Sequence, residues 1–241
     1  LLWGDERPPV SVHEPNGAPA PFAPPDLIIQ VVDATSLESH LELTLELSQL
    51  GRPMVIALNM MDAAWEKGLH INVKALSSML GMPLVPTVAL MGQGISELFT
   101  TAVAAAREAA CPLLQPASRH ISDSLQRLSQ ALDRPEIHAA FHVPHPLLLM
   151  RFAAWDTYFQ DELRQHFPEL LPELEQLRAE AERRLPRPLE EELHADRHHR
   201  AATLFEAGTR MGAPHEGRGW RYWLDELFLH PQWGLVGSLV V

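Results

Sequence analysis

The sequence is poor in residues that several classes of protein require. Its single cysteine, Cys111, excludes an intramolecular disulfide and a metal site built from several cysteines, and it suits a cytosolic setting. Basic residues are also few, since 19 Lys and Arg stand against 31 Asp and Glu, for a formal net charge of −12. Because binding to a phosphate backbone needs a basic surface, we expect no nucleic acid partner.

The sequence also lacks an apolar run long enough to span a membrane. It has no visible signal peptide, and its last nine residues, 233–241, carry no charge, whereas a helix that spans a bilayer needs about 20 residues. An aromatic, amphipathic segment precedes this run and is typical of a helix at a membrane interface, with core packing as the alternative. Because the sequence starts at Leu1 and stops within an apolar run, we expect both ends to be fragment boundaries.

The most informative stretch is Asp26–Asp62, which has the pattern of a strand, a helix and a second strand. The apolar run Leu27–Val32 predicts the first strand and Met54–Leu58 the second. Thr35, with Glu38 three residues later, predicts a capping box at the start of the helix between them. In a parallel unit of this kind, the loop after the second strand lies where open α/β sheets bind ligands.

That loop contains Asn59 and Asp62, separated by two residues. A carboxylate can accept two hydrogen bonds from the ring N–H and the exocyclic amine of guanine, whereas adenine offers no matching pair of donors. With the wrong base the carboxylate would stay unpaired, which is costly. The position directly after a buried strand therefore predicts a purine-reading loop.

The rest of the chain divides by composition. Residues 1–25 are rich in proline and predict a loop or linker, and residues 26–115 alternate strand and helix. The predicted fold class is therefore α/β, an incomplete doubly wound parallel sheet, followed over 116–216 by an all-α helical domain without strands. Its predicted helices are 121–132, 146–166, 169–185 and 189–211. Residues 217–241 form the amphipathic segment described above.

Two further helices are predicted within the first part. Asn72 is expected to cap a helix that ends at Gly81. A second helix over 95–110 is expected to bury one apolar face made of Ile95, Leu98, Phe99, Ala102, Val103 and Ala106.

Several ordered blocks match one known family. They are Asp26–Ala34, Leu41–Leu47, Val55–Asp62, Ala75–Gly81, Val85–Pro86, Gly92–Ile95, Ala195–Arg197 and Asp225–Leu235. The sequence thus resembles the cytosolic part of ferrous iron transport protein B, a bacterial GTPase-coupled iron transporter. The resemblance implies a guanine-nucleotide domain and a helical domain that couples it to a membrane pore for Fe²⁺. It also implies the cytoplasmic face of the bacterial inner membrane, with residues 217–241 leading into the first transmembrane helix.

The resemblance also implies the residues that contact the nucleotide. Asn59, Met60, Met61 and Asp62 would read the guanine of GTP or GDP, and Val88, Ala89 and Leu90 would close over the base. Ala89 stands where the family usually has Ser, and Met60 stands where related small GTPases often carry Lys. Both departures predict modest nucleotide affinity.

A larger departure is that no Gly-x-x-x-x-Gly-Lys-Ser/Thr loop occurs in the 241 residues. In the complete family protein this loop holds the phosphates and Mg²⁺. We therefore expect this polypeptide neither to hydrolyse GTP nor to bind it well, and we assign no catalytic residue. The first strand of the sheet should be missing too, which exposes a neighbouring strand edge and favours homo-oligomers.

Two other interpretations stay open. In one, the G-domain is vestigial and the helical domain acts only as a module for protein binding or assembly. In the other, the chain is a stand-alone GTPase of a different kind, without a membrane helix after Pro231.

Histidines form two groups, one made of His138, His142 and His145, and the other of His194, His198 and His199. His194 and His198 are four residues apart, a spacing that can chelate a metal on a helix. Exposed or capping roles are nevertheless the expectation for both groups, and the sequence assigns no metal ligand.

Overall fold

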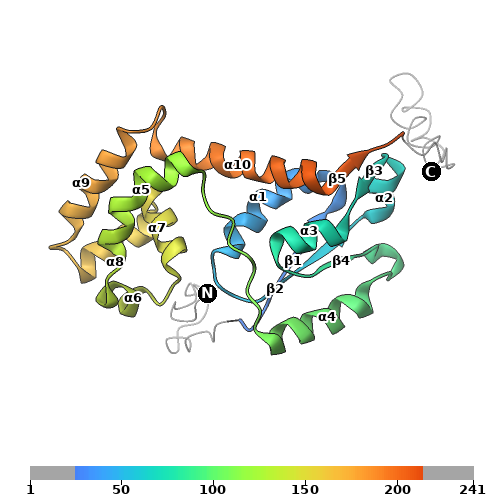
Figure 1. Ribbon diagram of the computed structural model, residues 1–241. Helices are drawn as coiled ribbons and strands as arrows, with labels where there is room; N and C mark the ends of the chain where they lie inside the picture. Colours follow the sequence, from blue (N-terminus) through green and yellow to red (C-terminus); the bar gives the residue numbers. More distant parts are fainter. Residues whose placement is uncertain (1–24, 214–241) are drawn as a thin grey trace, which may run out of the picture.

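A computed structural model describes residues 25–213 of the chain (Figure 1). The expected linker over 1–25, apart from its last residue, and the expected membrane lead-in over 217–241 lie outside these residues.

The strands are β1 (Ile28–Asp33), β2 (Met54–Asn59), β3 (Leu69–Ile71), β4 (Leu84–Pro86) and β5 (Thr209–Met211). The first helices are α1 (Leu37–Ser48), α2 (Met61–Glu66), α3 (Val73–Leu80) and α4 (Ile95–Glu108), with short 3-10 helices η1 (Ala34–Ser36) and η2 (Ala89–Met91). The later helices are α5 (Arg119–Leu132), α6 (Pro135–Phe141), α7 (His145–Ala153), α8 (Thr157–His166), α9 (Leu171–Glu182) and α10 (Leu189–Gly208). Within 25–213, no helix has the length and apolar character that a membrane crossing requires.

The main sheet is parallel, with the strand order β1-β2-β4. Alternate residues of β2 face opposite sides, so Met54, Ile56 and Leu58 join one apolar cluster with α1 and α3, while Val55 and Ala57 join another with α4. Helices therefore cover both faces, which confirms the predicted α/β fold with a doubly wound parallel sheet.

Helix α4 turns a narrower face to the sheet than expected. Leu98, Ala102 and Ala105 are buried, but Phe99 and Val103 are 60% and 52% exposed. The expected broad apolar face is therefore wrong at these two positions, because α4 packs mainly on β2 and β4.

Strand β1 forms one edge of the described sheet, in agreement with the expected exposed strand edge. Ile29 pairs with Val55, and Val31 pairs with Ala57, so all four side chains lie on the α4 side. The β2 residues are buried beneath α4, whereas Ile29 and Val31 are 39% and 63% exposed. Because α4 packs mainly on β2 and β4, β1 keeps an apolar surface exposed at Ile29 and Val31.

The second half folds into a helical bundle with its own core. Large buried side chains of this core come from α5, α6, α7 and α8, namely Ile121, Leu125, Leu128, Leu132, Ile137, Leu148, Phe152 and Leu163. Helix α10 runs from this bundle back along α1 and α3 (Figure 1). Its Leu189 and Leu193 lie in the helical core, and its Ala201 and Leu204 lie in the α/β core. One helix thus contributes to both cores.

Two local expectations about helix ends are wrong, and one is confirmed. Thr35 lies in η1, where its backbone N–H donates to the Asp33 side chain, and α1 begins at Leu37 without a side-chain cap, so the capping box does not form. The expected helix 146–166 is broken, because Trp155 adopts a φ of 63° and Asp156 caps a new helix. Asn72 does cap α3, by accepting from the Ala75 N–H at 3.0 Å.

The expectation that no strand follows Ser118 is also wrong. β5 pairs antiparallel with β3, with Leu69 opposite Met211 and Ile71 opposite Thr209. The two strands have three residues each, and α10 therefore ends at Gly208 rather than at Met211. This small sheet ties the end of α10 to the α/β part.

Candidate functional site

The candidate site begins at the carboxyl end of β2, which is buried from Met54 to Leu58. Asn59 follows at the edge of this core and is only partly buried. Its side-chain oxygen accepts the Ala89 backbone N–H at 3.0 Å and the Thr87 hydroxyl at 3.3 Å. Asn59 therefore joins the loop after β2 to the loop after β4, at the end of the sheet where parallel α/β folds bind ligands.

The loop after β4 is held in shape mainly by backbone hydrogen bonds. The Thr87 N–H donates to the Leu58 carbonyl at 2.8 Å, which extends the pairing of the two strands. Val88 and Gln93 exchange two bonds, of 3.1 and 3.2 Å, and so close a tight turn around η2. Gly94 has a φ of +75°, and a Cβ there would lie 2.2 Å from the Pro86 carbonyl oxygen. Only glycine fits that position without displacing the strand end.

The loop after β2 turns sharply at Met60, whose φ of 61° is left-handed. Helix α2 starts at the next residue, and Asp62 lies in its first turn, where a negative charge suits the exposed N–H groups. Asp62 is exposed, and its carboxylate has no hydrogen-bond partner among residues 25–213. The carboxylate is therefore available to an external donor.

The predicted site residues differ in their exposure. Leu90 is 90% exposed and Met60 is 42% exposed, and Ala89 is exposed as well. Met61 and Val88 are partly buried. The structure brings Asn59 and Ala89 into contact, and it places Met60, Met61 and Asp62 directly after them along the same end of the sheet.

Sequence reasoning missed one residue of this arrangement, Thr87. Its side chain is buried, with 3% exposure, and its hydroxyl shares the Asn59 oxygen with the Ala89 N–H. The signal was a threonine directly after a short apolar strand, a position from which a hydroxyl can reach the neighbouring strand end.

Comparison with known proteins gives matches to one family. Residues 22–102 match the family described as ferrous iron transport protein B. Over 79 residues the chain is 53% identical to an Fe(2+) transport protein A/Fe(2+) transporter FeoB fusion protein of Porphyromonas gingivalis. These residues are 33% of this chain and only 9% of that protein, so the chain matches about a tenth of the relative's length.

Solved structures extend the likeness to most of the chain. The structure of mGMPPNP-bound NFeoB from S. thermophilus is 26% identical, has a TM-score of 0.64, and matches 76% of this chain and 67% of its own. The cytosolic domain of L. pneumophila FeoB is also 26% identical, has a TM-score of 0.60, and matches 77% of this chain and 68% of its own. By sequence over residues 22–102 and by fold over about three quarters of the chain, this protein is thus similar to ferrous iron transport protein B.

Proposed function

We propose that this chain is the cytosolic guanine-nucleotide-binding and regulatory portion of a ferrous iron transporter at the cytoplasmic face of a bacterial inner membrane. The nucleotide's base would lie against the loops after β2 and β4. Fe²⁺ passage would belong to a membrane part of such a transporter. The relative from Porphyromonas gingivalis, which is described as an Fe(2+) transporter fusion protein, and the structural neighbour bound to mGMPPNP support this proposal.

One observation carries the proposal, namely the hydrogen bond from the Ala89 N–H to the side-chain oxygen of Asn59. It fixes the two loops side by side at the carboxyl ends of neighbouring strands, next to the Asp62 carboxylate, which no side chain or backbone group of residues 25–213 pairs with. In that place Asp62 can accept from the ring N–H and the exocyclic amine of guanine. Leu90 and Met60 offer exposed apolar surface to the flat faces of the base.

The residues present fit the base but not the phosphates. The 241 residues contain no Gly-x-x-x-x-Gly-Lys-Ser/Thr loop to cradle phosphate oxygens and to supply a hydroxyl for Mg²⁺. We therefore propose that this polypeptide binds GTP and GDP weakly and does not hydrolyse GTP.

The test separates base recognition from phosphate affinity. The ¹⁵N-labelled chain is titrated with GMP and, separately, with AMP, and the backbone amides are followed by NMR. We expect GMP to shift the amides of Asn59, Met60, Met61, Asp62, Val88, Ala89 and Leu90, and AMP to leave them unchanged. Asp62→Asn should weaken GMP binding roughly 10- to 100-fold, because two hydrogen bonds to a charged acceptor are lost.

The matched control is Glu66→Gln, which removes an exposed carboxylate from the other end of α2 and should leave GMP binding unchanged. Equal shifts with AMP, or shifts confined to other parts of the chain, would refute the assignment of the base site. Micromolar binding of a fluorescent GDP, or phosphate release from GTP above the buffer rate, would refute the second proposal alone.

A further inference from the structure

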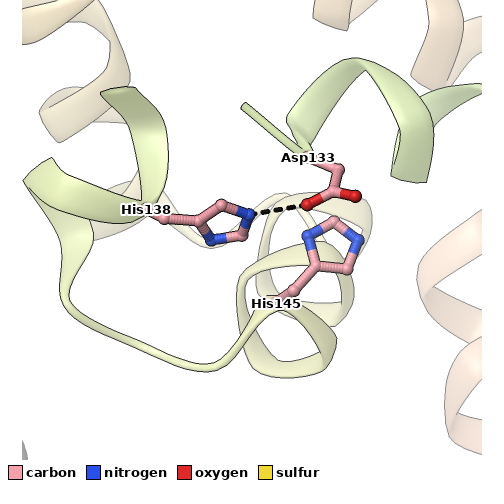
Figure 2. Close-up of side chains that lie close together, drawn as sticks. All are labelled: Asp133, His138 and His145. Carbon is pink, nitrogen blue, oxygen red and sulfur yellow. Dashed lines mark hydrogen bonds and ion pairs between the residues drawn. The ribbon is translucent and has the colours of Figure 1, made fainter. Parts of the chain in front are cut away.

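Three side chains that the nucleotide site does not use come together in the helical bundle. Asp133 is the residue at which α5 ends, His138 lies in α6, and His145 is the first residue of α7. One potential ligand atom from each lies within 4.8 Å of the other two. Figure 2 shows both imidazole rings next to the Asp133 carboxylate. We refer to these three residues as the bundle cluster.

The backbone beneath the bundle cluster is held by the helical core. Leu132 precedes Asp133, Ile137 precedes His138, and both are fully buried. Leu147, two residues after His145, is 2% exposed. Because each cluster residue lies within two positions of a buried core residue, packing in the helical core holds its backbone in place.

The hydrogen bonds of the bundle cluster leave one nitrogen unexplained. His138 Nε2 lies 2.8 Å from Asp133 Oδ1, and His145 Nε2 lies 2.8 Å from the Ser129 hydroxyl. The other ring nitrogen of His145, Nδ1, is buried and has no partner among residues 25–213. In Figure 2 the His145 ring turns one nitrogen toward the Asp133–His138 pair. A buried nitrogen without a partner is unfavourable, and a bound ion is one of its standard explanations.

A simple ion pair between His138 and Asp133 accounts for less of the arrangement. The Asp133 side chain is 67% exposed, and an ion pair of such an exposed group contributes little to stability. Such a pair gives no reason for the position of His145, whose ring centroid lies 5.5 Å from that of His138. It also leaves His145 Nδ1 without a partner.

We propose that Asp133, His138 and His145 bind one divalent transition-metal ion of the zinc class through two imidazole nitrogens and a carboxylate oxygen. Imidazole and carboxylate together suit Zn²⁺ and its neighbours, and Ser129 would orient His145 by holding Nε2. Ligands bound tetrahedrally at about 2.0 Å lie about 3.3 Å apart. The His138–Asp133 contact of 2.8 Å would open slightly while the wider separations close.

The ion would connect the end of α5, the middle of α6 and the start of α7 at the surface of the bundle. Because the Asp133 side chain is exposed, water can reach the fourth coordination position. The site does not depend on the nucleotide, so this proposal stands apart from the one made for the loops after β2 and β4.

The test is calorimetric titration of the full chain with ZnCl₂ in a buffer that does not chelate metals, followed by Co²⁺ substitution and visible absorption spectroscopy. We expect one equivalent of Zn²⁺ to bind, and the Co²⁺ protein to show the absorption of a four-coordinate site. His138→Gln and His145→Gln should each weaken binding at least tenfold and abolish that spectrum. Asp133→Asn, which changes an exposed side chain with little risk to folding, should also weaken binding at least tenfold.

Two control variants remove histidines outside the bundle cluster. His142→Asn changes an exposed neighbour with a φ of 51°, a conformation that Asn tolerates, and His194→Gln changes an exposed residue of α10. Both should keep the binding stoichiometry, the affinity and the Co²⁺ spectrum, and circular dichroism confirms that each variant is folded. The proposal is refuted if the unsubstituted chain does not bind Zn²⁺, if Asp133→Asn binds as well as that chain, or if the controls lose binding to the same extent.

Discussion

Asn59 is the residue on which the loop geometry depends most. Its oxygen serves a backbone donor and a buried hydroxyl, so it holds the loop of η2 against the end of β2. Such a bridging role needs a short side chain with a fixed acceptor, which Asn supplies. This structural role of Asn59 accompanies the base-reading role proposed for Asp62.

Replacing Asn59 with Ala should lower the free energy of unfolding by about 1–2 kcal/mol, because the buried Thr87 hydroxyl and the Ala89 N–H both lose their acceptor. Thr87→Val removes only one of these bonds and should cost less than Asn59→Ala. Urea unfolding of the two variants measures both values. If Asn59→Ala proves no more costly than Thr87→Val, the Ala89 bond contributes nothing to stability.

At the scale of elements, the turn between β4 and α4 depends on two glycines with left-handed φ. Gly92 has a φ of +70°, and a Cβ there would meet no atom within 4 Å. Gly94 has a similar φ, but its Cβ would collide with the Pro86 carbonyl. A substitution at Gly92 therefore tests backbone strain alone, whereas a substitution at Gly94 tests backbone strain together with a steric clash.

Gly92→Ala should cost about 1 kcal/mol of unfolding free energy through backbone strain alone. Gly94→Ala should cost at least about 2 kcal/mol, because β4 or the turn must also shift. Thermal and urea unfolding of the two variants provide the comparison. Equal costs would mean that the strand end yields freely to the added methyl group.

Elements with a regular pattern could be predicted from the sequence, and elements without one could not. β1 and β2 are continuous apolar runs, and α3 has an Asn cap and a terminal glycine. β3 and β5 have three residues each and pair across most of the chain, so no local pattern marks them. The break at Trp155 depends on a left-handed residue that is neither Gly nor Asn, and the sequence gives no sign of it.

The same distinction applies to the two sites. The loops of the proposed base site end buried strands, so their position in the fold could be predicted, although the contact of Thr87 could not. The bundle cluster needs Asp133 beside His138 and His145, and this depends on where α5 ends and α7 begins. The sequence showed the histidines but not the carboxylate that joins them.

At the scale of the whole molecule, α10 is tied to α1 by charged contacts as well as by apolar packing. Arg197 pairs with Glu46, and His198 Nδ1 lies 2.7 Å from Glu42 Oε1. The hydrogen bond to Glu42, helped by the charges of Glu42 and Glu38, raises the pKa of His198 above its usual value. The protonated imidazolium is therefore favoured in the folded protein.

The pKa of His198 is raised on folding, so its hydrogen bond to Glu42 stabilises the folded protein when the imidazole is protonated. This contribution to the free energy of unfolding should be fully present below about pH 6.5, the ordinary pKa of His, and should be lost as the pH rises through the folded-state pKa. His198→Gln should therefore lower the Tm more at pH 5.5 than at pH 9. The matched control is His199→Gln, an exposed neighbour on the same helix, which should show no such difference. A Tm decrease for His198→Gln that is equal at the two pH values would contradict the assignment.

Helix α10 buries its first turns in the bundle core and its last turns in the α/β core. It has 20 residues, and at 1.5 Å per residue it is a rod of about 30 Å. Turning such a rod by about 5° around one end moves the other end by about 2.6 Å, which is more than close packing tolerates. A shift of the helical bundle relative to α1 must therefore either displace β5 or separate α10 from α3. Helix α10 thus couples movement of the helical bundle to the α/β part.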